Sequence, residues 1–294
     1  MSLSSPTEQS TITRTEGDVP APPSADAAPP RSVRDWRWGA MPVWLRRVLV
    51  VVLLLTGWQL YVTISGVNPL LFSSPADVGR ALVAGFQNGE LLRATGTTMR
   101  VLLLGMLFGS LIAVVLTTLA VWTRFGEDVL VVFSSMLNPL PSIAVLPLAI
   151  LWFGLSETAL VFVVANAVIW PIAINVNTGF RTANRTIIAV GRNIGLKRWR
   201  MISEVLFPAA LPHTISGVKT AWAFGWRTIV ASELVFGVAG GGGGLGYFIN
   251  NSRYYLDIPD VFAGLVTIAV IGLLIDMVFI LIERRTVVRW GMKT

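Results

Sequence analysis

The chain has 294 residues, of which 54% are hydrophobic and 13% are charged. Soluble domains carry about 25% charged residues, so this composition excludes an ordinary soluble globular protein. The net charge is +7, but an excess of lysine and arginine in a membrane chain is typical of loops on the cytoplasmic side, and we expect no nucleic-acid partner. With no cysteine and one histidine, the chain has no disulfides or thiol nucleophile, and we expect no metal site.

The N-terminal segment is rich in proline, serine, threonine and alanine. Such a segment cannot bury a core, and we expect residues 1–44 to form a disordered cytoplasmic tail. A cleavable signal peptide has an apolar run directly after a basic start, whereas the first apolar run here begins near Val48. The remaining residues divide into a transmembrane domain over 45–290 and a short C-terminal tail over 291–294.

Apolar runs of about 20 residues locate the expected membrane spans. They predict an all-α membrane protein with six transmembrane helices, over residues 48–67, 101–123, 129–156, 158–180, 215–236 and 261–282.

Two of these spans are unusual. The run 129–156 is too long for one straight helix and contains Pro139, Pro141 and Pro147, so we expect a kinked or discontinuous helix. The run 215–236 contains Lys219, Arg227 and Glu233. At 100° per residue these three side chains fall within an arc of about 120°, which leaves one face of the helix apolar.

Basic residues in short loops predict the orientation of the chain. Residues 31–47, residues 181–204 and the tail from Glu283 are rich in arginine and lysine, and they lie on one side of a six-span chain. We therefore expect a multi-pass membrane protein with both termini in the cytoplasm. The polar segment 74–98 is expected to form an interfacial helix on the outer side.

The cytoplasmic loop 181–212 is the most informative segment. Isoleucine and valine recur at helical spacing in its first half, Gly195 follows, and apolar residues recur again over 199–207. Pro208 and Pro212 are expected to end this second helix. Two short amphipathic helices with basic flanks, joined by a glycine turn, suit docking into a groove of a partner protein.

This loop resembles the cytoplasmic loop of the permease subunits of ATP-binding-cassette importers, whose pattern is E-A-A, three residues, G, nine residues and I-x-L-P. In this chain Ala189 takes the place of the acidic residue, and Gly195 takes the place of the glycine at the family's spacing. The resemblance implies that an ATPase docks on Ala189, Val190, Gly191, Ile194, Gly195, Val205, Phe207 and Pro208.

Three further segments carry the resemblance to one branch of this family. Residues 137–157 (LNPLPSIAVLPLAILWFGLSE), 207–218 (FPAALPHTISGV) and 231–234 (ASEL) are similar to permeases of the nitrate, sulfonate, taurine and bicarbonate type. The resemblance implies a non-catalytic permease that forms a homodimer in the lipid membrane and passes a small, anionic solute delivered by an extracytoplasmic binding protein. The resemblance also implies a place in the bacterial inner membrane, no cofactor on this chain, and ATP and Mg²⁺ on separate ATPase subunits. The absence of a G-x-x-x-x-G-K-[ST] motif from the sequence agrees with this expectation.

Charged residues inside spans cost about 2.5 to 3.5 kcal/mol each and must face a partner or water. Lys219 and Asp276 lie at comparable depth and are expected to pair. Arg227 lies deeper and is expected either to attract an anionic substrate or to pair with Glu233 or with a group on another span. Trp222 and Trp226 lie on the same arc of the helix, and they either line the pathway or pack against other helices. The candidate residues for a translocation path are Asn138, Ser142, Trp222, Trp226, Arg227 and Glu233.

Two other classes of protein remain as alternatives at this point. An ion-coupled secondary transporter would use the charges inside the spans, but six spans without an internal repeat are few for that class. An intramembrane enzyme would need paired catalytic groups, for which Lys219 and Asp276 are the candidates.

Overall fold

The computed structural model describes residues 42–236 and 243–288, and every regular element in these ranges is helical. Most of the expected N-terminal tail and the whole C-terminal tail lie outside the described residues, although Val43 and Trp44 already belong to the first helix. The chain divides into two compact units, residues 1–54 and 55–294. The second unit contains all the expected functional residues.

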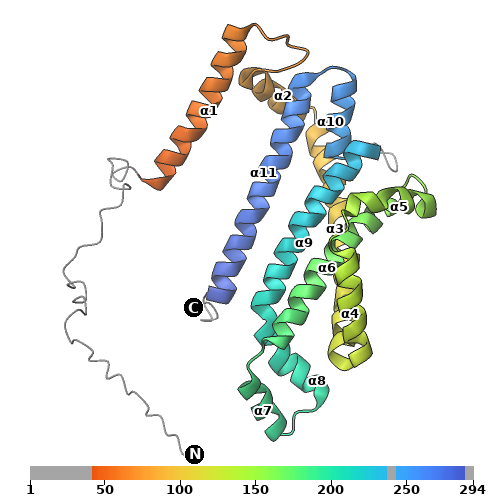
Figure 1. Ribbon diagram of the computed structural model, residues 1–294. Coiled ribbons are helices and arrows are strands. Elements are labelled where there is room, and N and C mark those ends of the chain that lie inside the picture. The colour runs from red at the N-terminus through yellow and green to blue at the C-terminus, as the bar shows by residue number, and fades with distance from the viewer. Residues whose placement is uncertain (1–41, 237–242, 289–294) are drawn as a thin grey trace, which may run out of the picture. The chain divides into compact units, whose positions relative to one another are not determined.

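The helices follow one another in the order shown in Figure 1. They are α1 (Val43–Ser65), α2 (Pro75–Gln87), α3 (Glu90–Trp122), α4 (Arg124–Leu137), the 3-10 helix η3 (Ser142–Val145), α5 (Leu146–Phe153), α6 (Glu157–Arg181), α7 (Arg185–Asn193), α8 (Arg198–Met201), the π-helix η4 (Ile202–Leu206), α9 (Phe207–Phe236), α10 (Leu245–Tyr254), α11 (Ile258–Glu283) and the π-helix η5 (Arg284–Val288).

Among the described residues, four helices are long and apolar enough to cross a membrane, namely α1, α3, α6 and α11 with its continuation to Thr286. A fifth span is present if α4 and the η3–α5 segment count as one. The expectation of an all-helical membrane protein is thus confirmed for the described ranges. Helix α9, which carries the three charged residues of the fifth expected span, is not among these candidates.

The expected break in the third span is confirmed. Helix α4 and the η3–α5 segment are bent by 94° at residues 138–141, where Pro139 and Pro141 have no N–H to continue the helix. Figure 1 shows α5 turned sharply away from the axis of α4.

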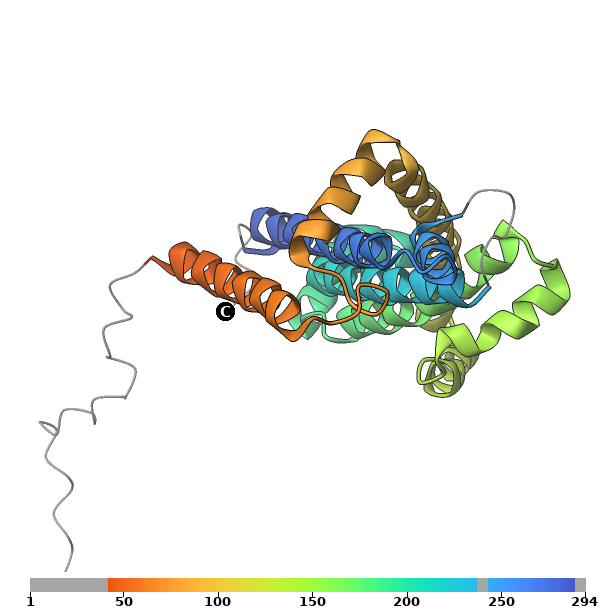
Figure 2. The same cartoon turned by 90° about the horizontal axis from the view of Figure 1, so that it is seen from above.

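Helix α6 forms the centre of the second unit, with α3 and α9 packed beside it (Figures 1 and 2). Gly105 and Gly109 of α3 stand in a G-x-x-x-G spacing, which lets membrane helices approach closely. A Cβ on Gly105 would lie 2.4 Å from Cγ1 of Val164, and one on Gly109 would lie 2.8 Å from Cγ1 of Val168. The two valines of α6 therefore occupy the notches left by the two glycines.

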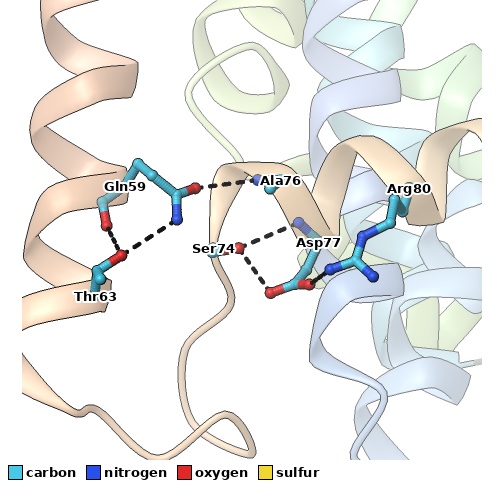
Figure 3. A network of polar contacts seen from close by, with 6 residues as sticks. All are labelled: Gln59, Thr63, Ser74, Ala76, Asp77 and Arg80. Carbon is cyan, nitrogen blue, oxygen red and sulfur yellow. Dashed lines mark hydrogen bonds and ion pairs between the residues drawn. The ribbon is translucent and has the colours of Figure 1, made fainter.

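Helix α2 begins with a side-chain cap at Ser74 (Figure 3). The Ser74 hydroxyl accepts a hydrogen bond from the Asp77 N–H at 3.2 Å and donates one to the Asp77 carboxylate at 2.7 Å. This hydrogen bond, helped by the charge of Arg80, lowers the pKa of the Asp77 carboxyl. The carboxylate therefore stabilises the start of α2 above the ordinary pKa of aspartate, and this contribution is lost as the pH falls through the lowered pKa. Beside the cap, the Ala76 N–H donates to the Gln59 side chain of α1 at 3.4 Å.

The single helix expected over 74–98 is divided in two, because α2 ends at Gln87 and α3 already begins at Glu90. The polar residues at the start of α3 have protein partners. Thr98 is buried and hydrogen-bonded, and Arg100 forms a 2.6 Å ion pair with Glu157 of α6. Because these groups are paired within the protein, the helix extends well beyond the uncharged run that starts at residue 101.

The expectation that Pro208 and Pro212 end the second helix of the loop is wrong. Helices α8, η4 and α9 follow one another without a break, and α9 contains both prolines. Pro212 lies inside α9, where a proline removes one backbone donor and can bend a helix without ending it. The wider turns of η4, in which the Phe207 N–H bonds to the Ile202 carbonyl, precede Pro208 and let the chain continue.

Candidate functional site

The loop between α6 and α9 folds as a helical hairpin, which we call the α7–α8 hairpin (residues 185–206). Gly195 lies in the turn with φ +76°, a left-handed conformation that favours glycine. The N–H groups of Gly195 and Leu196 donate to the carbonyls of Arg192 and Gly191, both at 3.0 Å, and so close the end of α7. Gly191 is buried against Met201, where an added Cβ would lie 2.8 Å from the methionine Cε.

Most of the residues expected to dock an ATPase lie on the surface of this hairpin or just after it. Ala189, Val190, Ile194, Gly195, Phe207 and Pro208 are exposed, Val205 is half-buried and Gly191 is buried. Ile194 is 69% exposed although it is fully apolar. Two further large apolar side chains, Ile187 and Trp199, are also exposed and extend the surface. Their helical spacing was visible in the sequence, but the family's motif does not include them. Grouped exposed apolar side chains of this kind mark an interaction surface.

A cavity of about 210 Å³ lies where the break between α4 and η3 meets α6 and α9. Its polar lining includes Asn138, Ser142, Arg227 and Thr228, and its apolar lining includes Trp170 and Phe224. Three of the six residues predicted for a translocation path, Asn138, Ser142 and Arg227, are therefore brought together although two different parts of the chain supply them. The Arg227 side chain is exposed and has no hydrogen bond or ion pair to any residue that the structure describes.

The two tryptophans predicted for the path lie elsewhere on α9. Trp222 is half-buried and packs against Phe279 of α11, with ring centroids 6.3 Å apart. Trp226 is buried and belongs to the hydrophobic core. Neither residue lines the cavity at Arg227.

Glu233 lies at a buried junction of α3, α9 and α10 and is only 2% exposed. Its carboxylate accepts a hydrogen bond from the Thr98 hydroxyl at 2.9 Å and another from the Gly246 N–H at 2.9 Å. The same hydroxyl accepts a hydrogen bond from the Leu245 N–H at 2.8 Å. The carboxylate thus faces the first turn of α10, where a negative charge is favoured. In the described part of the chain no three acidic or histidine side chains gather as a metal site would require.

The expected pair between Arg227 and Glu233 is wrong. The two side chains point about 120° apart around α9, so one faces the cavity and the other faces α3 and α10.

The expected pair between Lys219 and Asp276 is also wrong, since these two described residues form no ion pair. In the antiparallel helices α9 and α11, the contact of Trp222 with Phe279 places Asp276 about 9 Å along the axis from the level of Lys219. Apolar packing between the two helices, rather than the charges, sets their register.

Comparisons with known proteins agree with this arrangement. Residues 102–288 match the family model of binding-protein-dependent transport system inner membrane components. The chain is 33% identical over 260 residues to the riboflavin transport system permease protein RibX of Chloroflexus aurantiacus. The aligned region covers 88% of this chain and 94% of RibX. It is 31% identical over 257 residues to SsuC of Escherichia coli K12, described as an aliphatic sulfonates transport permease, over 86% of this chain and 96% of SsuC.

The fold also matches a solved structure, the inward-facing MetNI methionine ABC transporter. The TM-score is 0.56 with 18% identity, and the match covers 67% of this chain and 95% of the other. The family match includes the α7–α8 hairpin, the cavity at Arg227 and all of α9 and α11. The chain therefore belongs to the family of binding-protein-dependent transport system inner membrane components, and it is a non-catalytic permease subunit of an ATP-binding-cassette importer, in which a separate subunit hydrolyses ATP.

Proposed function

We propose that this permease imports a small anion, such as a sulfonate, through a path that includes the cavity at Arg227. The observation that carries the proposal is that Arg227, which has no hydrogen bond or ion pair within residues 42–236 and 243–288, lines the same cavity as the amide of Asn138 and the hydroxyl of Ser142. Guanidinium, amide and hydroxyl donors together suit an oxyanion. The similarity to SsuC supports a sulfonate, whereas RibX is named for riboflavin, and the donor groups that line the cavity are our reason for preferring an anion.

The proposal includes α9 as a sixth membrane span. With 30 residues, α9 is longer than the roughly 20 that cross a bilayer, and it packs along α6, which is a span by length and composition. An arginine that faces lipid costs about 2.5 to 3.5 kcal/mol, so the exposed face of α9 at Arg227 is better placed toward water or a second copy of the chain. We assign this face to the path between two copies, with both termini in the cytoplasm.

Replacing Arg227 with glutamine is expected to lower sulfonate uptake by about tenfold to a hundredfold, since a hydrogen bond to a charged group contributes about 1.5 to 3 kcal/mol. The measurement is uptake of a labelled alkanesulfonate into proteoliposomes that contain the permease, its ATPase and its binding protein.

The matched control is Arg253→Gln, which removes an exposed arginine of α10 that does not line the cavity. Uptake by this variant should equal that of the wild type. If Arg227→Gln transports at the wild-type rate in an intact complex, the cavity is not the anion site.

We further propose that the α7–α8 hairpin is the cytoplasmic element on which the ATPase docks. The exposed apolar side chains Val190, Ile194 and Trp199 support this assignment, as does Gly195 at the family's position in the turn. ATP and Mg²⁺ bind to the ATPase, and movement of its groove is transmitted to α6 and α9 through the two ends of the hairpin. Membership of the importer family does not favour an ion-coupled secondary transporter.

A cysteine at Ile194 is expected to form a disulfide with a cysteine placed in the ATPase groove, with a yield that changes with ATP and vanadate. The natural chain has no cysteine, so each introduced thiol is unique in this subunit. Tyr255→Cys, an exposed position in the turn between α10 and α11, should give no cross-link. Absence of cross-links from Val190, Ile194 and Trp199 alike would argue against docking at this hairpin.

A further inference from the structure

A second cavity, of about 540 Å³, lies between the α7–α8 hairpin and the ends of α3, α4 and α6. Its polar lining consists of Glu127, Asn177, Arg181 and Arg192. The remaining lining is apolar and includes Phe180 of α6 and Ile202 of η4. We call this space the hairpin cavity. Its wall has both charged and apolar side chains.

The charges of the hairpin cavity are not balanced. Arg181 forms an ion pair with Glu127, which ties the end of α6 to the start of α4. Arg192, on α7, has an exposed side chain with no hydrogen bond or ion pair to any residue in the described ranges. Two arginines and one glutamate give the lining a net charge of +1. A single negative charge would neutralise it.

The π-helix η4 forms part of the wall of this cavity. Ile202 and Leu206, its first and last residues, both line the cavity. Wider turns of this kind are rare and occur frequently at functional sites. The turns of η4 widen ahead of Pro208 and shape this wall of the cavity, and the unbalanced charge of the lining is the reason to assign a ligand to the space.

We propose that the hairpin cavity binds the phosphodiester head group of an anionic phospholipid. Guanidinium groups bind phosphate oxygens in a bidentate manner, and basic pockets between helices at the cytoplasmic side of a membrane hold anionic head groups. A phosphatidylglycerol head group carries the one negative charge that the lining lacks, and its acyl chains match the apolar part. The proposal rests on the cytoplasmic placement of the hairpin proposed above.

The bound phosphate would join two parts of the protein. Arg181 belongs to α6 in the central bundle, whereas Arg192 belongs to α7 in the hairpin. An anion held by both arginines fixes the hairpin relative to the bundle. Because the ATPase is proposed to dock on the hairpin, occupancy of the cavity by lipid strengthens the coupling between ATP hydrolysis and the spans.

The test is retention of lipid by the purified full chain, measured by native mass spectrometry after exchange into mixtures of phosphatidylcholine and phosphatidylglycerol. We expect the wild type to retain phosphatidylglycerol in preference to phosphatidylcholine. Arg192→Gln should lower this retention by about tenfold, the effect of losing one charge-assisted hydrogen bond. Arg192→Lys, which keeps the charge, should retain more lipid than Arg192→Gln.

The matched control is Arg200→Gln, because Arg200 lies on α8, pairs with Glu204 at 3.0 Å and does not line the cavity. This variant should retain phosphatidylglycerol as the wild type does. Equal retention by the wild type and Arg192→Gln would overturn the site, and displacement of the lipid by millimolar inorganic phosphate would assign it to a free anion instead. Lipid retention needs neither ATPase nor substrate, so its failure can be told from failure of the Ile194 cross-link or of uptake.

Discussion

Replacing Glu233 with alanine is expected to lower the free energy of unfolding by about 3 kcal/mol. The substitution leaves the Gly246 N–H and the Thr98 hydroxyl without an acceptor inside the protein, and it opens a cavity at a position only 2% exposed. It also removes the negative charge from the first turn of α10. The measurement is the midpoint of thermal unfolding of the purified permease in one detergent.

Two other variants distinguish the loss of the hydrogen bonds from Thr98 and Gly246 to Glu233 from a general effect of losing a glutamate. Glu233→Gln keeps the shape and one acceptor, and it should fall between the wild type and the alanine variant. Glu157→Gln removes a glutamate that pairs with the exposed Arg100, and such surface pairs contribute less than about 1 kcal/mol. The role assigned to Glu233 is wrong if its alanine variant is no less stable than Glu157→Gln.

Replacing Gly105 with alanine is expected to destabilise the packing of α3 on α6 by about 3 kcal/mol, at the upper end of the usual cost of overpacking. The new methyl group would lie 2.4 Å from Val164 Cγ1, 2.6 Å from Val164 Cβ and 3.3 Å from the Val161 carbonyl. No rotation of the valine moves its Cβ, so the two helices must separate. We expect a lower yield of monodisperse protein and a lower unfolding midpoint.

The same substitution at Gly96 is the matched control. Gly96 is in the same helix, but a Cβ there has no neighbour within 4 Å. Gly96→Ala should therefore be neutral or slightly stabilising, because alanine favours the helix by up to about 1 kcal/mol over glycine. Equal unfolding midpoints for the Gly105 and Gly96 variants would contradict the close packing of α3 on α6.

The spans with clear ends could be predicted from the sequence alone. The run expected over 158–180 is helix α6, Glu157–Arg181, and the run expected over 261–282 is helix α11, Ile258–Glu283. An uncharged run between Glu157 and Arg181 forms α6, and the run that forms α11 is flanked by Asp260 and Glu283 and contains one charge, Asp276. The cost of burying charge in lipid therefore indicates the ends of both spans. The break at Pro139 and Pro141 was also predictable, because two prolines two residues apart remove two backbone donors within one helical turn.

The remaining features depend on contacts between distant parts of the chain. Thr98 and Glu233 are 135 residues apart, and no local pattern indicates that they meet. The same holds for Arg227, whose neighbour Asn138 comes from another span. The sequence shows that a charged side chain inside a span needs a partner or water. Which group meets that side chain depends on how α3, α6 and α9 pack. The predicted pairs therefore failed, although the charged residues themselves were correctly singled out.

The charges of α9 also bear on how the protein is made. On the proposed six-span topology, α9 carries Lys219, Arg227 and Glu233 into the bilayer, and each costs about 2.5 to 3.5 kcal/mol when it meets lipid alone. Glu233 gains its acceptor role only when Thr98 of α3, synthesised earlier, and Gly246 of α10, synthesised later, are both in place. A chain that stops at the end of α9 would therefore lack one of the two hydrogen-bond donors to Glu233, and the buried carboxylate is fully satisfied only after α10 has been made.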